Sequence, residues 1–258
     1  MSQNVFLWGA GWLGLPLAKS ISESGNNVSC ITRSSEKKNF LISLSLNAIT
    51  LDELVDEPEI LKKCDVLIVT VPPVAEFSFN ESLSFFLKSL PYFCHVIYTG
   101  STGIYKNPEG LIDENSEIDS IKGVFQIEDF LQKQIHQNLT ILRLGGLIGP
   151  KRHPVHFLVK KPVNENPNQV VNLVQQIDVI KVVLYFINSK KSGIFNVCSP
   201  EHPTRKEYYN LAAKAFGLRP ISFENDQHQS GKIVDIKKLV ELIPDHTFNS
   251  IYDFEKCK

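Results

Sequence analysis

The clearest pattern of apolar positions lies at the start of the chain, where residues 5–8 read Val-Phe-Leu-Trp without interruption. An unbroken apolar run predicts a strand of a parallel sheet, because helices cover both faces of such a sheet. The following apolar positions, with the spacing of one helix face, are Leu15, Leu17, Ala18 and Ile21. We therefore expect the chain to begin with a strand, a turn and a helix.

Similar apolar runs, separated by helical spacings, continue along most of the chain. Strands are expected at 28–32, 48–51, 66–71, 96–99, 139–144, 170–174 and 193–197, and helices at 77–90, within 118–137, at 178–188 and at 204–217. Asp178 and Thr204 are the expected N-caps of the last two helices, and Glu207 completes a capping box with Thr204. Strands that alternate with helices predict an α/β fold, a doubly wound parallel sheet with right-handed crossovers.

The turn between the first strand and the first helix reads Gly9-Ala10-Gly11-Trp12-Leu13-Gly14. Gly9 permits the tight turn, Gly11 lets a pyrophosphate approach the backbone, and Gly14 lets the helix pack closely on the strand. The N–H groups and the positive dipole end of the helix would then hold the phosphates. The glycine pattern alone is a weak signal, but strand, motif and helix in this order predict a dinucleotide-binding (Rossmann) fold.

The rhythm of strands and helices breaks at residues 145–150, and the segment that follows as far as 168 is rich in Pro, Lys and His. We expect residues 1–150 to form the dinucleotide-binding domain, with its sheet completed by residues from 170–198. Residues 151–169 and 199–258 would form a small α/β appendage that binds a small-molecule substrate. Two histidines in the excursion, His153 and His156, could face that substrate.

The end of the second strand bears on which dinucleotide is bound. Sites selective for NAD place an Asp or Glu about 20 residues after the glycine motif, where it accepts a hydrogen bond from the ribose 2′-OH. Here the sequence reads Thr32-Arg33-Ser34, with Lys37 and Lys38 close behind. Arg33 and two hydroxyls could hold a 2′-phosphate by charge-assisted bonds, which favours NADP, with NAD as the alternative. The other interpretation of Arg33 is a solvated surface charge.

Two further strand ends complete the predicted cofactor site. Asp52 follows the third strand and either contacts the adenine edge or caps the helix that starts at Glu53. Pro72 and Pro73 force a loop at the carboxyl end of the fourth strand, which is where doubly wound sheets bind ligands. The predicted cofactor-binding residues are Gly9, Gly11, Trp12, Leu13, Gly14, Thr32, Arg33, Ser34, Asp52, Val71, Pro72 and Pro73.

Composition narrows the choice of partners and compartment. The 258 residues are 43% hydrophobic and 21% charged with a formal net charge of −1, which indicates a globular chain without a broad nucleic-acid footprint. Apolar runs fall short of the roughly 20 residues of a membrane span, and we expect no signal peptide before the first strand. The cysteines are odd in number and lack Cys-x-x-Cys spacing: Cys30, Cys64, Cys94, Cys198 and Cys257. They indicate buried free thiols in a reducing cytoplasm, and we predict no metal site.

Three later segments resemble one enzyme family. Residues 96–105, Val-Ile-Tyr-Thr-Gly-Ser-Thr-Gly-Ile-Tyr, resemble the fifth-strand motif of extended short-chain dehydrogenase/reductases. Residues 142–150 are similar to their sixth-strand motif ending in Gly-Pro, and residues 172–179 to their Asn-x-Ile-His-x-x-Asp-Val segment. The segments stand in the right order over nearly the whole chain, so the sequence resembles the NAD(P)-dependent epimerase/dehydratase group.

The resemblance implies an active site of Ser or Thr with Tyr-x-x-x-Lys, and it places the serine role, substrate orientation, on Ser101. In the family the tyrosine is the acid/base and the lysine lowers its pKa. Aligning Glu128 with the family's helix glutamate puts Ser120 and Val124 where Tyr and Lys belong, and neither can do that proton chemistry. Tyr105 is the candidate replacement acid, with a packed loop aromatic as the alternative interpretation.

These observations leave two main functions open. The first is an NADP-dependent oxidoreductase or epimerase that acts on a nucleotide sugar or another small carbonyl compound, with Ser101 polarising the reacting oxygen. The second is a non-catalytic NAD(P)-binding sensor or scaffold, which the missing Tyr-x-x-x-Lys pair supports. A β-hydroxyacid dehydrogenase ranks last, because it needs an all-helical second half that the strand-bearing C-terminal region does not offer.

Overall fold

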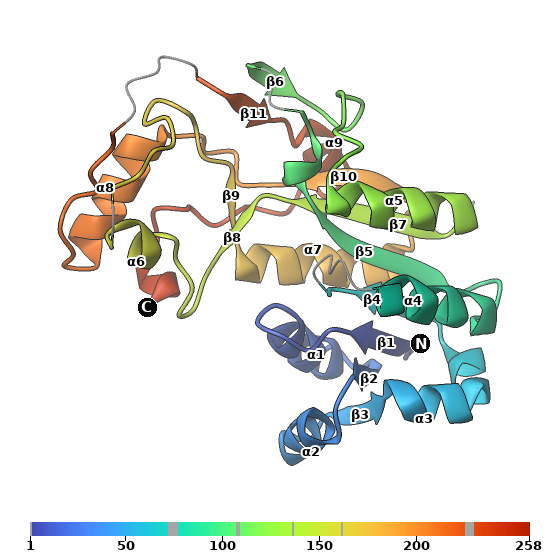
Figure 1. The fold of residues 1–258 in the computed structure, drawn as a ribbon. Coiled ribbons are helices and arrows are strands. Elements are labelled where there is room, and N and C mark those ends of the chain that lie inside the picture. Colours follow the sequence, from blue (N-terminus) through green and yellow to red (C-terminus); the bar gives the residue numbers. More distant parts are fainter. Residues whose placement is uncertain (1, 72–76, 107–108, 136, 161, 225–229) are drawn as a thin grey trace. The chain divides into compact units, whose positions relative to one another are not determined.

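The computed structural model of the protein describes residues 2–71, 77–106, 109–135, 137–160, 162–224 and 230–258 (Figure 1). The first apolar run forms β1 (Asn4–Trp8), whose last four residues are all buried. The strand pairs in parallel with β2 (Asn27–Thr32) on one side and with β4 (Val66–Val69) on the other. A strand with two parallel neighbours and buried side chains is the central strand that its sequence predicts.

Seven strands form one sheet in the order β10-β7-β5-β4-β1-β2-β3. The remaining four are β3 (Asn47–Thr50), β5 (His95–Ser101), β7 (Leu139–Leu144) and β10 (Gly193–Val197). The chain progresses outward from β1 to β3 and then resumes at β4, so the strand order reverses between β1 and β4. This confirms the α/β fold class with a doubly wound sheet, and it puts the topological switch point where the glycine motif ends β1.

The helices expected at 77–90, within 118–137, at 178–188 and at 204–217 lie close to those positions, and the chain also forms helices that the sequence pattern did not predict. The helices are α1 (Gly14–Glu23), α2 (Ser35–Ser43), α3 (Leu51–Asp56), α4 (Phe77–Ser89), α5 (Gly123–Gln134), α6 (Val155–Leu158), α7 (Gln176–Ser189), α8 (Arg205–Ala215) and α9 (Lys237–Leu242), with 3₁₀ turns η1 (Pro58–Lys63), η2 (Thr102–Ile104) and η3 (Phe254–Cys257). The capping box of Thr204 and Glu207 at the start of α8 is confirmed. Gly217, at φ +66°, follows the C-cap of that helix.

The capping role predicted for Asp178 is wrong. Helix α7 begins two residues earlier, at Gln176, so Asp178 lies inside the first turn. Its carboxylate, fully buried, accepts hydrogen bonds from the backbone N–H of Asn249 at 2.9 Å and from the side-chain amide of Asn249 at 2.6 Å. Asp178 therefore ties α7 to the C-terminal segment rather than capping its own helix.

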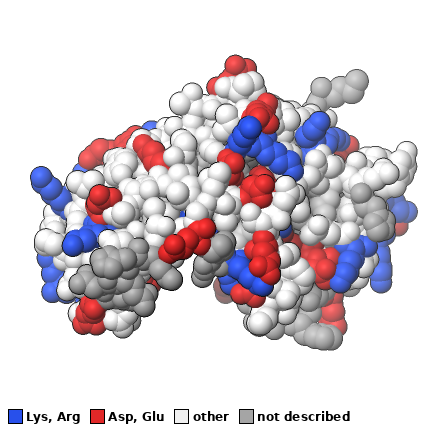
Figure 2. All heavy atoms as spheres, turned by 90° about the horizontal axis from the view of Figure 1, so that it is seen from above, with Lys and Arg blue, Asp and Glu red and all other residues white. Residues whose placement is uncertain are grey.

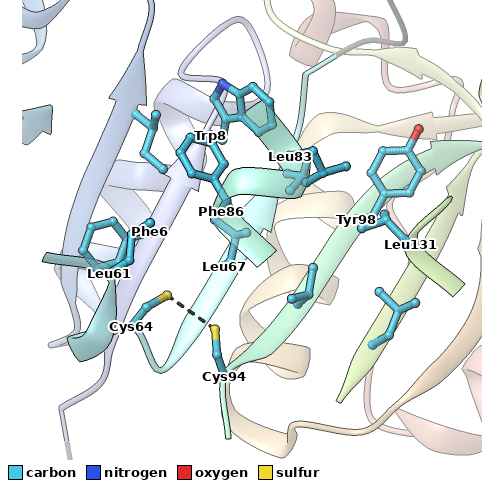
Figure 3. Packing of buried hydrophobic residues seen from close by; sticks show 14 of the residues in the cluster. Phe6, Trp8, Leu61, Cys64, Leu67, Leu83, Phe86, Cys94, Tyr98 and Leu131 are labelled. Atoms are coloured by element: carbon cyan, nitrogen blue, oxygen red, sulfur yellow. Dashed lines mark hydrogen bonds between the residues drawn. The ribbon is translucent and has the colours of Figure 1, made fainter. Parts of the chain in front are cut away.

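One face of the sheet packs on α4 and α5 through a continuous apolar cluster (Figure 3). Trp8 of β1 meets Phe86 of α4 edge to face, with ring centroids 5.0 Å apart. Tyr98 of β5 and Leu131 of α5 belong to the same cluster. Edge-to-face aromatic contacts add to the stabilisation from burial alone, so this layer stabilises the packing of α4 and α5 on the sheet.

Among the described residues, two small sheets accompany the large one. Strand β8 (Gly146–Ile148) pairs in parallel with β9 (Leu173–Gln175), which is shorter than the strand predicted over 170–174. Val170 instead forms an isolated bridge with Thr204. Strand β6 (Gly110–Ile112) pairs in parallel with β11 (Lys232–Val234), a pairing that the sequence pattern did not predict.

The chain divides into two compact units. The first comprises Met1–Gly100, Ser120–Leu142 and Ile180–Ile194, and the second comprises Ser101–Asp119, Arg143–Val179 and Phe195–Lys258. The second unit has an apolar core of its own, in which Tyr208, Ala212 and Ile251 are fully buried. The domain boundaries predicted from the sequence stay a prediction.

Surface charge and cysteine burial agree with the composition. Figure 2 shows Lys and Arg interspersed with Asp and Glu on the face turned to the viewer, in a chain of formal net charge −1. All five cysteines are free and buried, as predicted. Within the part of the chain that the structure describes, no helix is both long and apolar enough to span a bilayer.

Candidate functional site

The glycine turn between β1 and α1 is built so closely that two of its glycines cannot carry a side chain. Gly9 has φ +114°, and a Cβ there would lie 2.7 Å from Oγ1 of Thr70 and 3.0 Å from the backbone N of Val71. A Cβ on Gly14 would lie 2.0 Å from the Gly9 carbonyl oxygen. The turn at Gly9 and the close approach of α1 at Gly14 are therefore steric requirements of this backbone.

Gly11 differs from both, because no described atom beyond its own chain neighbours lies within 4 Å of a Cβ built on it. Its N–H donates to the Gly9 carbonyl at 2.8 Å, and its own carbonyl accepts from the N–H of Leu15 at 2.9 Å. The N-cap of α1 is Leu13, which cannot cap with its side chain, and the first turn holds no acidic residue. Since a helix N-terminus favours negative charge, this end of α1 has the chemistry of an anion site with open space at Gly11.

The end of β2 carries the residues predicted to select the cofactor. Thr32 is buried, whereas Arg33 and Ser34 are exposed. The Ser34 hydroxyl caps α2 by accepting from the N–H of Lys37 at 3.2 Å. Lys38 forms an ion pair of 2.5 Å with Glu53. Ser34 is thus already engaged in the local fold, and Arg33 is the exposed cation directly at the strand end.

Asp52 does not cap the helix that follows β3. Helix α3 begins at Leu51, and its N-cap is Thr50, whose hydroxyl accepts from the N–H of Glu53 at 3.2 Å. The Glu53 carboxylate accepts in return from the N–H of Thr50 at 2.8 Å. Asp52 is an exposed residue in the first turn of α3, so its proposed contact with adenine stays a prediction.

At the end of β4, the strand stops at Val69, two residues before the predicted end. Thr70 then donates from its hydroxyl to the Gly9 carbonyl at 2.7 Å, and Val71 is half-buried beside the turn. The predicted cofactor contacts Pro72 and Pro73 lie outside the described residues.

Ser101 ends β5 and caps the 3₁₀ turn η2. Its hydroxyl accepts from the N–H of Gly103 at 3.0 Å. The side chain is half-buried, so the hydroxyl proton can be offered to a ligand while the oxygen caps the turn. The turn is held by Thr102, which donates to the Leu144 carbonyl at 3.2 Å, and by Lys232, whose ammonium donates to the Thr102 carbonyl at 3.2 Å.

Tyr105, the candidate replacement acid, is completely buried and its hydroxyl is engaged on both sides. It donates to Oδ1 of Asn196 at 2.6 Å and accepts from Arg143 at 2.9 Å. The guanidinium of Arg143 also lies 4.9 Å above the tyrosine ring, and the backbone N–H of Asn196 donates to the Glu114 carboxylate at 2.7 Å. Burial raises the pKa of Tyr105, with Arg143 opposing the shift. These contacts favour the packed-aromatic interpretation of Tyr105.

The two histidines of the excursion after β8 do not act as a pair. His153 is 1% exposed and packs against the rings of Tyr208 and Phe216. His156 is exposed, and its ring lies 4.8 Å from that of Phe216. The prediction that His153 could face a substrate is wrong, because its ring is part of an aromatic core.

Sequence reasoning missed the residues whose partners are distant in the chain. Thr70 bonds to a carbonyl 61 positions earlier, and Lys232 bonds to a carbonyl 130 positions earlier. A threonine at the end of an apolar run and a lysine in a short polar segment carry no local signal for such contacts. Among the described residues, no group of three or more His, Cys, Asp or Glu is placed to hold a metal ion.

Comparison with known proteins agrees with this architecture. No protein-family model matches the chain. The chain is 32% identical to Protein YeeZ of Escherichia coli strain K12 over 254 residues, which cover 90% of this chain and 91% of YeeZ. The solved structure of UDP-glucuronic acid 4-epimerase from Bacillus cereus in complex with NAD is similar with a TM-score of 0.76 and 19% identity, over 99% of this chain and 97% of that one. MoeE5 in complex with UDP-glucose and NAD gives 0.76 and 16% identity over 98% and 97%.

The fold is therefore that of the NAD(P)-dependent epimerases and dehydratases, which confirms at the level of the fold the resemblance seen in the sequence. Within that class, sequence identity of 32% to YeeZ over nine-tenths of both chains defines the family of this chain. The chain belongs to the YeeZ family.

Proposed function

We propose that the protein binds NADP(H) and catalyses an oxidoreductase or epimerase reaction on a nucleotide sugar or another small carbonyl compound. The observation that carries the proposal is the glycine turn. Gly9 and Gly14 are excluded from carrying side chains by close backbone contacts, while Gly11 faces open space. The turn lies at the switch point between β1 and β4, where doubly wound sheets bind ligands.

The chemistry of the turn suits a pyrophosphate. The start of α1 has no capping side chain and no carboxylate in its first turn. A phosphate placed there would accept from backbone N–H groups, meet the positive end of the helix dipole, and face no competing negative side chain. A side chain at Gly11 would occupy the space that the pyrophosphate needs.

The choice of NADP over NAD rests on Arg33. It is exposed at the carboxyl end of β2, and no acidic residue occupies the positions from 32 to 35. A carboxylate there would bond the ribose 2′-OH of NAD and repel a 2′-phosphate, whereas a guanidinium offers a planar pair of donors to a phosphate. Arg33 directly follows the last residue of β2, at the strand end where the ribose of the adenosine lies in this fold, so it is the cation we assign to the 2′-phosphate.

The nicotinamide, when bound, would supply the hydride acceptor or donor. Of the residues of this chain, Ser101 is the one we assign to the substrate: its half-buried hydroxyl can donate to the reacting oxygen and polarise the carbon–oxygen bond. The UDP sugars bound by MoeE5 and by the epimerase of the same fold support a nucleotide sugar as substrate. Five buried thiols support a cytoplasmic location.

One observation favours a second function, a non-catalytic NAD(P)-binding sensor or scaffold. The positions of the family's tyrosine and lysine hold Ser120 and Val124, and the hydroxyl of Tyr105 is buried in a polar network. A protein that lacks a positioned proton donor can still bind the dinucleotide through the same glycine turn. The two functions share the binding step and differ only in turnover.

Calorimetric titration of the protein with NADPH and with NADH tests the binding step. We expect NADPH to bind at least about tenfold more tightly than NADH, and Arg33→Ala to remove that preference while leaving NADH affinity unchanged. Lys38→Ala is the matched control, because it removes a nearby cation that is already paired with Glu53. If neither NADPH nor NADH produces heat on titration, the proposal is overturned.

Turnover with a panel of nucleotide sugars then separates the enzyme from the sensor. The oxidation state of the nicotinamide and the configuration of the sugar are followed by absorbance and by NMR. We expect Ser101→Ala to lower kcat without changing NADPH affinity. Tight NADPH binding with no conversion of any sugar or simple carbonyl compound would favour the sensor.

A further inference from the structure

We propose that Thr70 is a positioning residue for the dinucleotide: its hydroxyl fixes the Gly9 carbonyl and thereby sets the orientation of the glycine turn that receives the pyrophosphate. The inference rests on the proposed binding of a nicotinamide dinucleotide at this turn. Thr70 is the residue that follows β4, on the strand next to β1 at the switch point of the sheet. Its side-chain hydrogen bond joins the ends of these two strands, in addition to the backbone hydrogen bonds that pair β1 with β4.

The hydroxyl proton of Thr70 has one preferred acceptor. The Thr70 Oγ1 lies 2.7 Å from the Gly9 carbonyl oxygen and 3.3 Å from that of Trp8. The Trp8 carbonyl already accepts from the backbone N–H of Thr70 at 2.9 Å. A hydroxyl carries a single proton, so the shorter contact to Gly9 is the hydrogen bond that forms.

The Gly9 carbonyl is held from three sides. Its oxygen accepts from the Thr70 hydroxyl at 2.7 Å and from the N–H of Gly11 at 2.8 Å. The backbone of Gly14 packs against the same oxygen, at a distance that leaves no room for a Cβ. One atom therefore joins the end of β4, the glycine turn and the first residue of α1.

Fixing this carbonyl also fixes the next N–H group. The peptide between Gly9 and Ala10 is trans, since the described residues contain no cis peptide bond. In a planar trans peptide the C=O and the N–H point in opposite directions. A Gly9 carbonyl held toward β4 turns the Ala10 N–H away from β4, and a rotation of this peptide would change the donors that the turn offers to an anion.

A valine in place of Thr70 would have nearly the same shape but no donor. The Gly9 carbonyl would keep its bond from Gly11, but the tie to β4 would be lost and the peptide could rotate. Binding of the pyrophosphate would then have to restore the orientation that the threonine provides in advance. Thr70→Val is therefore expected to weaken NADPH binding about three- to tenfold, the effect of one lost hydrogen bond.

The neighbouring strand offers a matched control. Thr99 lies near the end of β5, and its hydroxyl donates to the Val69 carbonyl of β4 at 3.3 Å. Thr99→Val thus removes a bond of the same type, between the same kind of strand ends, without touching the glycine turn. We expect this variant to bind NADPH like the wild type.

The experiment compares the affinities of wild type, Thr70→Val, Thr70→Ser and Thr99→Val for NADPH and for adenosine 2′-monophosphate, which lacks the pyrophosphate. We expect Thr70→Val to lose NADPH affinity, Thr70→Ser to restore it to within about twofold by returning the hydroxyl, and adenosine 2′-monophosphate to bind all four proteins equally. A purely structural role would weaken the binding of both ligands together, whereas restoration by serine shows that the hydroxyl, and not the methyl group, carries the effect. Should Thr70→Val not fold, Thr70→Ala takes its place.

The outcomes separate this inference from the proposed function. A wild-type protein that binds neither NADPH nor NADH overturns the proposed function itself. A wild-type protein that binds NADPH, together with a folded Thr70→Val variant of equal affinity, overturns only the role of Thr70. Equal losses in Thr70→Val and Thr99→Val would do the same, because the effect would then belong to the strand ends in general.

Discussion

Gly14 and Gly9 are in such close contact that a Cβ on the first would lie 2.0 Å from the carbonyl oxygen of the second. The Gly9 carbonyl cannot move aside, because it is bonded to the Thr70 hydroxyl and to the N–H of Gly11. We predict that Gly14→Ala forces α1 away from β1 and lowers the free energy of unfolding by about 1–3 kcal/mol. Chemical unfolding of the variant beside the wild type measures this loss, and an unchanged midpoint would contradict the close packing.

Gly11→Ala should leave stability nearly unchanged and weaken NADPH binding. A methyl group at this position meets no described atom beyond its chain neighbours within 4 Å, so we expect the free energy of unfolding to change by less than about 0.5 kcal/mol. The same methyl group would stand where the pyrophosphate approaches, so NADPH affinity should fall at least about tenfold. The pair of measurements on one variant separates folding from binding, and retained NADPH affinity would place the dinucleotide elsewhere.

Tyr105→Phe tests whether the tyrosine is an acid or a structural residue. Removing the hydroxyl leaves the side-chain Oδ1 of Asn196 without its donor and deprives Arg143 of an acceptor in a buried network. We expect a loss of stability of about 1–3 kcal/mol and no change in NADPH affinity. A variant with wild-type stability but no turnover would instead support Tyr105 as the acid. Asn196→Ala should reproduce the stability loss, since it removes the other partner.

Stability should depend on pH through His153. Its Nδ1 accepts from the N–H of Val155 at 3.2 Å, so the neutral ring carries its proton on Nε2, 2.9 Å from the hydroxyl of Tyr208. Burial, with a smaller effect of the nearby His156, lowers the pKa of His153 from 6.5 to about 4. Between pH 6.5 and about pH 4, His153 is protonated in the unfolded chain but stays neutral in the folded protein. The stability present at pH 7 is therefore lost as the pH falls toward 4.

That loss amounts to about 3 kcal/mol for His153 over the full window. Urea unfolding at intervals from pH 7 to pH 4 measures it. His153→Phe should flatten the dependence, because phenylalanine has no proton to gain, whereas the exposed control His156→Gln should retain most of it. His95, whose pKa burial also lowers to about 4, and His202, whose pKa burial lowers as well, contribute to the slope that remains in both variants.

The parts of the fold that sequence predicted best are those that depend on neighbouring residues. The run from β1 through the glycine motif to α1 is local, and its strand, turn and helix all occur where the pattern placed them. The capping box of α8 is equally local. At α3 the sequence Thr50-Leu51-Asp52-Glu53 contains the same capping signal, with Thr50 and not Asp52 as the N-cap.

Long-range contacts account for what could not be predicted. The Asp178 carboxylate accepts hydrogen bonds from Asn249, 71 positions later in the chain, so the general preference of Asp for N-caps does not apply here. The pairing of β6 with β11 joins two three-residue strands, which are too short to leave a periodic pattern. The same holds for the candidate site, where the partners of Tyr105 and Thr70 are brought in by the fold and not by the sequence around them.

The buried thiols decide how all of these unfolding experiments must be done. Cys64 and Cys94 lie with their sulfur atoms 3.5 Å apart in the core, and burial raises the pKa of Cys64, which keeps it protonated and unreactive while the protein is folded. Once unfolded, the chain releases five cysteines into solvent together. Oxidation would then cross-link them in arrangements that the native packing never permits, and refolding would fail. A reductant in the buffer is therefore a condition for reversible denaturation of this protein.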